Sequence, residues 1–423
     1  MTSETAVQDD LASRAETSDD LLKNGFGGKP DPWHSRLRAF FRRRGKCFFA
    51  LLAALVFLLC FVIVAVIGND TLYSSQERAV RKALVRLKFE NYNTVEGVTD
   101  EDPAYIVCRA LGASTTLLNP EKDAEIYVQY NDFNRQYNRS HASVMEKVRR
   151  FGVFHANVRR IDAFNSMKDR TFEMGVNKFA DMTTDEFMAL QGARVSTPKF
   201  DRSAVALVLD GTIETVDIDL RRDGRMTAVK DQGTCGSCWA FAALAVVEAY
   251  FKEQRSLILD LSEQQLVDCV EECHGCNGGD SYQAYQYITS RGVYTRAAYP
   301  YNAQEGQCMS PPGEPRYRLQ EFRIAESPDL VHLLKMHGPL TVYAAVTPMW
   351  QFYKSGILNY CGDTVNHAVT LAGAGQIDQE AFWLIKNSWG TSWGEEGYVR
   401  VARGSSSLKD ECGMSHVALF AVS

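Results

Sequence analysis

The sequence has little excess of charge of either sign. It contains 46 Lys and Arg against 52 Asp and Glu, and its formal net charge is −6. Proteins that bind nucleic acid usually carry a basic face or a basic-aromatic module. The chain has neither, so we do not expect a nucleic-acid partner. Its 423 residues are too many for one typical domain and predict two or three.

Cysteine is scarce in the first half of the chain and dense in the second. Cys47, Cys60 and Cys108 are the only early ones, and eight more lie between Cys235 and Cys412. Such density is typical of proteins that fold in an oxidising lumen.

Long apolar runs are equally scarce, because residues 47–67 form the only one. About twenty uncharged, apolar residues are enough to cross a bilayer as a helix. A cleaved signal peptide is the alternative, but its apolar core is about 7–15 residues long and lies near the N-terminus. Basic residues crowd the end of the preceding polar tail, 1–46, which places that tail in the cytoplasm. We therefore predict a type II signal anchor with a luminal C-terminal part.

Residues 68–120 are expected to be a luminal stalk or spacer. The basic amphipathic stretch Gln76–Leu87 is compatible with a juxtamembrane helix or with a solvated spacer. No chemistry follows from this region.

The stretch from Gln232 to Phe241, QGTCGSCWAF, is the strongest chemical signal. A helix-favouring apolar run follows it, which places Cys238 in the first turn of a buried helix. Amide donors and the helix dipole there favour thiolate over thiol. With an imidazolium nearby, we expect a thiol pKa of roughly 3.5–7.5. Cys238 is thus a candidate nucleophile.

The motif C-G-S-C-W, with His367 129 residues and Asn387 149 residues after Cys238, resembles the signature of papain-family, cathepsin L-like cysteine proteases. The resemblance implies that Cys238 attacks a peptide carbonyl and that His367 transfers the proton through an acyl-enzyme (thioester) intermediate. It also implies that Asn387 orients the imidazole and that Gln232, with the Cys238 amide, stabilises the oxyanion. Trp389 is expected to shield the His-Asn contact from water.

The same resemblance implies a substrate cleft. Gly278 and Gly279 would form the wall along which a peptide pairs with backbone. The specificity pocket is expected to be lined by Asp280, Ser281, Tyr343, Val365, Ala368 and Val417. Apolar burial in this pocket favours Leu or Val two residues before the cut. Asp280 and Ser281 stand where apolar residues are usual in the family. An alternative interpretation is therefore that the Asp280 carboxylate lies at the rim of the pocket and accepts polar or basic side chains.

A propeptide motif precedes the catalytic part. Residues 146–165 reproduce the pattern E-x3-R-x2-V-F-x2-N-x3-I-x3-N, and residues 175–181 reproduce G-x-N-x-F-x-D. Both resemble the inhibitory propeptide of cathepsin L-like enzymes, here 121–213, whose end would run backwards through the cleft. We expect the carboxylates of Glu146 and Asp181 to have depressed pKa values, so that acid weakens the propeptide.

The peptidase part, 214–423, is expected to have an α+β, papain-like two-domain fold. Its first half contains helix signals, including Ser262 as an N-cap. Its second half alternates as strands over 341–346, 368–373, 381–386 and 397–401, which predicts a barrel-like half. The cleft would lie between the two halves. Along the chain, this fold is preceded by a helical inhibitory prodomain and one transmembrane helix.

If Cys238 stays free, seven cysteines remain in this part. The resemblance implies three disulfides: Cys235–Cys276, Cys269–Cys308 and Cys361–Cys412. Cys273 then has no partner. A zinc site formed by Cys269, Cys273, His274 and Cys276 is the alternative, but two of those cysteines have disulfide assignments, so we predict no metal and no cofactor.

We therefore predict a membrane-anchored zymogen of a cysteine endopeptidase, activated by acid in a lysosome, endosome or vacuole. The stretch from Gly279 to Cys308 contains no His and leaves no room for the insertion that makes some relatives exopeptidases. Proteins and peptides would be substrates, cystatin-like proteins inhibitors, and clathrin adaptors partners of the tail motifs 19–22 and 31–33. The alternative is a non-catalytic papain-fold protein that binds or regulates. Loss of Cys238, His367, Asn387 or Gln232 would indicate this alternative, and none of the four is lost.

Overall fold

The computed structural model describes residues 55–56, 58–59, 75–87, 102–111, 119–193, 216–326, 329–404, 412–414 and 416–422. The chain divides into two units, residues 1–75 and 76–423. Among the described residues no helix is both long and apolar enough to cross a membrane. The tail 1–46 lies outside the described residues. So does the predicted anchor 47–67, except for residues 55–56 and 58–59, which are helical.

The second unit contains helices and one large sheet. The helices are α2 (Pro103–Leu111), α3 (Pro120–Gln136), α4 (Val144–Asn165), α5 (Thr184–Met188), α6 (Cys238–Arg255), α7 (Glu263–Cys269), α8 (Ser281–Arg291) and α9 (Leu330–His337), with a short 3-10 helix η2 (Gly275–Asn277). The strands are β1 (Phe172–Met174), β2 (Ile218–Asp219), β3 (Glu321–Glu326), β4 (Leu340–Ala344), β5 (Tyr353–Leu358), β6 (His367–Ile377), β7 (Glu380–Lys386), β8 (Tyr398–Ala402) and β9 (Val417–Val422).

The predicted stalk is partly folded. Residues 76–86 are helical, Val80 and Leu84 in this segment are completely buried, and Arg81 pairs with Asp102 at 2.6 Å. Helix α2 packs against α4, and Gly152 of α4 lies against Ala110. Over these residues the chain is therefore part of the folded prodomain and not a solvated spacer.

Helices α3 and α4 pack against each other around an aromatic core. Asn119 caps α3 and Ser143 caps α4, each by accepting a hydrogen bond from a main-chain amide three residues later. Between the helices, Tyr127 meets Phe151 edge-on and Tyr130 packs on Phe154. The helical prodomain predicted from the motif is thus present.

Asn side chains of α4 hold the chain that follows the helix pair. The Nδ2 atom of Asn157 donates to the carbonyls of Ala180 and Met182, each at 2.9 Å. Asn165 exchanges hydrogen bonds with the main chain of Met174 in β1. Because β1 pairs antiparallel with β5, the prodomain adds a strand to the sheet of the peptidase part.

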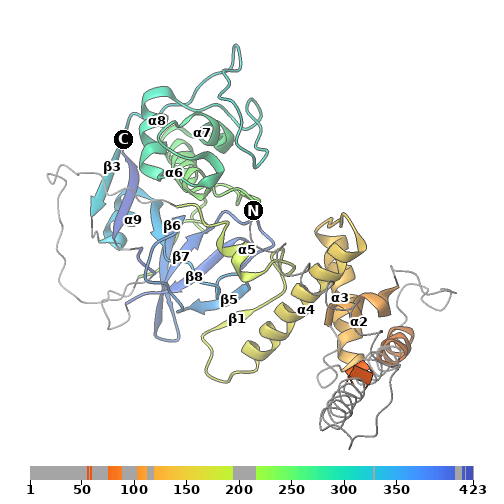
Figure 1. The fold of residues 1–423 in the computed structure, drawn as a ribbon. Coiled ribbons are helices and arrows are strands. Elements are labelled where there is room, and N and C mark those ends of the chain that lie inside the picture. Colours follow the sequence, from red (N-terminus) through yellow and green to blue (C-terminus); the bar gives the residue numbers. More distant parts are fainter. Residues whose placement is uncertain are drawn as a thin grey trace, which may run out of the picture. The chain divides into compact units, whose positions relative to one another are not determined.

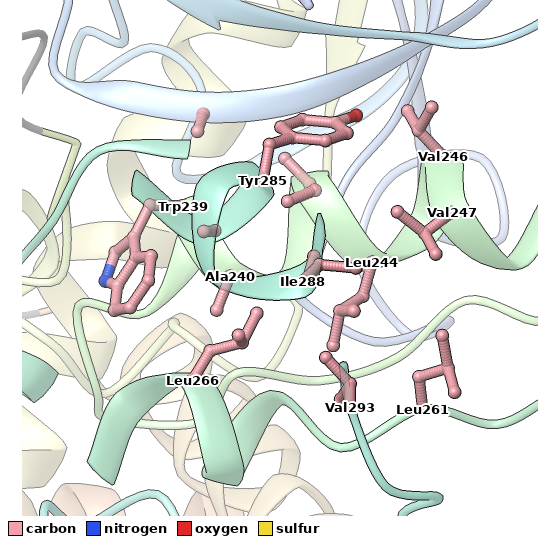
Figure 2. Close-up of a cluster of buried hydrophobic side chains, with 14 of the residues drawn as sticks. Trp239, Ala240, Leu244, Val246, Val247, Leu261, Leu266, Tyr285, Ile288 and Val293 are labelled. Carbon is pink, nitrogen blue, oxygen red and sulfur yellow. The ribbon is translucent and has the colours of Figure 1, made fainter. Parts of the chain in front are cut away.

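The peptidase part consists of a helical half and a sheet half. Helices α6, α7 and α8 enclose an apolar cluster built from Trp239, Leu244, Leu266, Tyr285, Ile288 and their neighbours (Figure 2). Figure 1 shows these helices beside the strands, and α6 packs against β6. Ser262 caps α7 as predicted, because its side chain accepts from the Gln265 amide.

The strands predicted in the second half correspond to β4, β6, β7 and β8. They form a nine-stranded sheet in the order β1-β5-β8-β7-β6-β4-β9-β3, with β2 paired to β6. Among the described residues the end strands β1 and β3 are not paired with each other, so the strands of the predicted barrel-like half form a sheet that is not closed by hydrogen bonds between its ends. The long strand β6 lies at its centre, with His367 as its first residue.

Candidate active site

Cys238 is the first residue of α6, and its side chain is completely buried. The preceding residue, Ser237, does not cap the helix with its side chain but shares a hydrogen bond with the hydroxyl of Tyr301 at 2.7 Å. The amide of Ala368, in β6, donates to Cys238 Sγ at 3.5 Å. The thiol of the helical half therefore meets the strand that begins with His367.

His367 is oriented by a chain of hydrogen bonds. Its Nε2 lies 2.8 Å from Asn387 Oδ1, and the amide of Ser388 donates to that same oxygen at 2.8 Å. Because the Ser388 amide donates to this atom, it is the amide oxygen of Asn387, which can only accept. Nε2 of His367 must therefore carry the proton in this hydrogen bond. In the neutral ring, Nδ1 then holds the lone pair, and it has no hydrogen-bond partner. Trp389 stacks on His367 with centroids 4.9 Å apart.

Gln232 is buried and oriented by the same segment. The hydroxyl of Ser388 donates to Gln232 Oε1 at 2.6 Å. This hydrogen bond fixes the side-chain amide, so that the Nε2 donor points away from Ser388. Nε2 donates to the carbonyl of Cys235 at 2.9 Å and lies 3.4 Å from that of Leu190. Sequence reasoning missed Ser388, because its position between Asn387 and Trp389 does not show that it reaches a residue 156 positions earlier.

The prodomain crosses this site with residues 190–193. The amide of Gly279 donates to the Gly192 carbonyl at 2.9 Å, and the amide of Ala193 donates to the Asn366 carbonyl at 3.0 Å. A Cβ at Gly192 would lie 2.0 Å from the carbonyl oxygen of Gly236, so only glycine fits there. The rest of the predicted cleft-crossing tail, from 194 on, and the expected processing site near Glu214 lie outside the described residues.

Burial changes the expected ionisation of the site. Burial raises the pKa of the Cys238 thiol, and hydrogen bonds from the amides of Ala368, Gly192 and Trp239 lower it by less. Burial also lowers the pKa of His367 to about 4, against a smaller opposing effect of Asn387. The sequence predicted a depressed thiol pKa, which is wrong for this covered state, because exclusion of water disfavours both charged forms.

Four of the predicted pocket residues take part in one large apolar cluster. Tyr343 and Ala368 are buried within this cluster, and Val365 and Val417 pack against it, as does Ala193 of the prodomain. Gly278 has a φ of 109°, which favours glycine. A Cβ at Gly279 would lie 2.6 Å from the Trp239 ring, so a larger residue does not fit there.

Asp280 and Ser281 are not the rim groups that one interpretation of the sequence suggested. Asp280 is 5% exposed, accepts from the hydroxyl of Tyr343 and caps α8 by accepting from the Tyr282 amide. Ser281 is buried, and its hydroxyl donates to the Trp239 carbonyl at 2.9 Å. Both polar side chains thus form hydrogen bonds inside the protein: Asp280 to Tyr343 and to the start of α8, and Ser281 to Trp239.

All three implied disulfides are present: Cys235–Cys276, Cys269–Cys308 and Cys361–Cys412. Cys269 and Cys276 therefore cannot ligate zinc as thiolates, which removes the zinc alternative. Cys273 is free and buried, and it accepts a hydrogen bond from the Asp280 amide at 3.4 Å. Burial raises its pKa to about 12, so it is a neutral thiol.

Comparison with known proteins agrees with this geometry. Residues 215–422 match the model of the papain family cysteine proteases, and residues 130–187 match the cathepsin propeptide inhibitor domain (I29). Fruit bromelain of Ananas comosus is 35% identical over 322 residues, covering 74% of this chain and 91% of the relative. A cysteine proteinase of Theileria parva is 31% identical and covers 72% of this chain and 74% of its own length.

Solved structures give the same result. The precursor of recombinant stem bromelain is similar with a TM-score of 0.63 and 35% identity, covering 70% of this chain and 98% of that one. Digestive procathepsin L 3 of Tenebrio molitor has a TM-score of 0.63 and 30% identity, with 70% and 98% covered. The chain belongs to the papain family of cysteine proteases. It is a cysteine peptidase whose own propeptide acts as the inhibitor.

Proposed function

We propose that the chain is the membrane-anchored zymogen of a cysteine endopeptidase in which Cys238, His367, Asn387 and Gln232 carry the chemistry. The observation that supports this proposal best is the joint geometry of the site. The hydrogen bond from His367 Nε2 to Asn387 leaves Nδ1 as the proton acceptor. The Cys238 sulfur accepts from the amide next to that histidine.

The proposed reaction begins when His367 Nδ1 takes the thiol proton and Cys238 Sγ attacks the peptide carbonyl carbon. The oxygen becomes an oxyanion that Gln232 Nε2 and the Cys238 amide stabilise. When the intermediate collapses, the C–N bond breaks and Nδ1 returns the proton to the leaving amine. Water, deprotonated by His367, then attacks the thioester, the C–S bond breaks, and the acid product leaves.

In the zymogen the propeptide occupies the place of a substrate without being cut. The Leu190 carbonyl approaches Gln232, and Gly192 and Ala193 pair with Gly279 and Asn366. A substrate would run from the Gly279 wall toward Cys238, since the residue whose carbonyl is attacked follows the one in the pocket. The propeptide passes these points in the opposite order, which keeps its carbonyls out of line with the thiol.

Acid is the proposed trigger of activation. Arg149 and Arg150 bind Glu146 at 2.8 and 2.9 Å, and these hydrogen bonds lower the Glu146 pKa to about 2. Arg150 also binds Glu186 at 2.7 Å. Burial raises the pKa of Glu186, but the hydrogen bonds from Arg150 and from the Thr183 amide outweigh burial, so the pKa of Glu186 is lowered. These depressed pKa values mean that the network stabilises the prodomain near neutral pH and is lost in acid.

Asp181 does not share this role, contrary to the sequence-based expectation. Burial raises its pKa, and the nearby Arg139 and Arg150 oppose that effect only in part. A carboxyl whose folded pKa is raised contributes stability that is present at low pH and is lost as pH increases. Protonation of Asp181 therefore does not weaken the prodomain.

Activity is tested by labelling the purified full-length chain with an active-site epoxide while the pH is lowered. Labelling is expected to rise with acidification together with loss of the propeptide near Glu214, and Cys238→Ala is the control. A chain beginning at Gly68 that is fully labelled at neutral pH without cleavage would contradict acid activation. A long unstructured protein should yield internal fragments, because release of dipeptides or single residues alone would contradict an endopeptidase.

Residues 47–67 are the proposed signal anchor, with 1–46 in the cytoplasm and the peptidase part in the lumen of a lysosome, endosome or vacuole. The support is the length and apolar character of the segment. The full chain should stay with membranes in alkaline carbonate, whereas a chain that starts at Gly68 should be extracted. Release of both would refute the anchor. Cystatin-like inhibitors and clathrin adaptors remain proposed partners, to be tested by direct binding.

The proposed specificity pocket favours Leu or Val two residues before the cut. The ring of Tyr343 and the side chains of Ala368, Val365 and Val417 make it apolar and shallow, and the buried Asp280 is directed at Tyr343. A positional peptide library in which Arg or Lys is preferred at this position would refute the ranking.

A further inference from the structure

A lysine of the prodomain is withdrawn from water beside the cleft. Lys178, in the G-x-N-x-F-x-D motif, places Nζ 2.5 Å from Oδ1 of Asp231, and its side chain is only 13% exposed. Burial lowers the pKa of Lys178, and Asp231 opposes that effect. Burial of an ammonium is unfavourable without a well-placed anionic partner, and Asp231 is that partner.

The position of Asp231 does not depend on Lys178. The amide of Gly233 donates to Asp231 Oδ1 at 2.8 Å, and the Asp231 backbone forms an antiparallel bridge with Trp389. Gly390, at a φ of 75°, makes room for the carboxylate, because a Cβ there would lie 2.9 Å from Oδ2. The carboxylate is thus held in place by the peptidase part alone and will remain there after the prodomain leaves.

The course of the prodomain indicates on which side of the cleft Asp231 lies. Lys178 contacts Asp231, Leu190 approaches Gln232, and Gly192 pairs with Gly279, so Asp231 and Gly279 are contacted at opposite ends of this segment. Lys178 belongs to the prodomain segment before Leu190, and the next residue, Phe179, packs edge-on against Trp389 at 5.5 Å. Because the prodomain runs opposite to a substrate, residues before 190 cover the surface that would contact the part of a substrate after the cut.

We propose that Asp231 forms a subsite for the cationic side chain of a substrate residue, Lys or Arg, that follows the scissile bond. In the zymogen, Lys178 occupies this subsite as an internal ligand. A cavity of about 740 Å³ adjoins the pair, and most of its lining comes from the prodomain. The peptidase part contributes Asp231, Gly233 and Thr234, which stay in place when the prodomain leaves. This inference rests on the proposed function, since it concerns how the same site chooses its substrates.

The test uses the acid-processed full-length protein and internally quenched peptides with one fixed Leu-containing sequence before the cut. Lysine is moved through the first three positions after the cut, and each peptide is compared with its norleucine counterpart. We expect kcat/KM to rise about two- to fivefold for lysine at one position, because an ion pair with a partly exposed carboxylate is modest in strength. The gain should shrink in 1 M salt, where screening acts within about 3 Å.

Asp231→Asn is the diagnostic variant, because an amide oxygen can still accept from Gly233 while the charge is lost. It should remove the difference between lysine and norleucine. Asp223→Asn is the matched control: it removes the same charge from an exposed side chain in the turn after β2. An equal rate for lysine and norleucine at every position, or a gain that persists in Asp231→Asn, would overturn the inference. Failure of the wild-type protein to hydrolyse even the norleucine peptides would instead overturn the proposed function.

Discussion

Truncation of Phe187 should open the zymogen at neutral pH. Phe187, in α5, is completely buried, and its ring lies edge-on to Trp389 at 5.3 Å and to Phe179 at 5.3 Å. One of these neighbours belongs to the prodomain and the other to the peptidase part. About half of the area that the ring buries, on the order of 100 Å², therefore depends on docking of the prodomain.

The expected effect follows from that area. At about 25 cal/mol per Å², Phe187→Ala loses about 2.5 kcal/mol of docking free energy. Each factor of ten corresponds to about 1.4 kcal/mol, so the population of the open zymogen should rise about 60-fold.

The assay is the rate at which an active-site epoxide labels the full-length chain at neutral pH, before any processing. The rate should rise in proportion to the open population for Phe187→Ala. Met145→Ala, which changes an exposed side chain of α4, should label like the wild type. A Phe187→Ala chain that remains folded by thermal unfolding and yet labels no faster than the wild type would refute the reasoning.

Three further predictions concern the chemistry, the pH response and the stability. Gln232→Ala should lower kcat about 10²–10³-fold with little change in KM. Steady-state kinetics on a fluorogenic peptide would measure this loss, and a kcat equal to that of the wild type would contradict the role of Gln232. Glu146→Gln should raise the pH at which labelling is half-maximal. The reason is that a carboxylate with a folded pKa of about 2 stabilises the prodomain above its unfolded pKa of about 4.3, and that stability is lost between these values. Asp181→Asn should not raise that pH, because burial raises the pKa of Asp181, and an upward shift equal to that of Glu146→Gln would contradict the assignment. Replacing Cys235 and Cys276 together by Ala should lower the free energy of unfolding by about 4 kcal/mol, because the disulfide closes a loop between residues 41 positions apart in the sequence. An unchanged Tm in calorimetry would contradict this prediction.

The sequence alone was sufficient for the features that depend on residues near one another in the chain. The periodicity of 120–165 predicts the two prodomain helices, and the alternation in the second half predicts strands that the structure contains. The C-G-S-C-W motif places Cys238 at the start of α6. Together with the spacing of His367 and Asn387, it was enough to recognise the family and, by resemblance, the three disulfides.

The tertiary structure alone decided how the polar groups behave. Burial raises the pKa of the Cys238 thiol and lowers the pKa of His367 to about 4, so the exclusion of water favours the neutral form of both groups. Asp280 is an internal hydrogen-bond acceptor because the fold brings Tyr343, 63 residues away, to it.

The same reason separates Glu146 from Asp181. Both belong to recognised motifs, but Glu146 meets two arginines on its own helix, whereas Asp181 is buried by packing against distant segments. Spacing in the sequence predicts which residue types are available. Ionisation depends on the water and the charges around each group, and the pairs Lys178–Asp231 and Ser388–Gln232 exist only because the folded chain brings distant residues within hydrogen-bond distance.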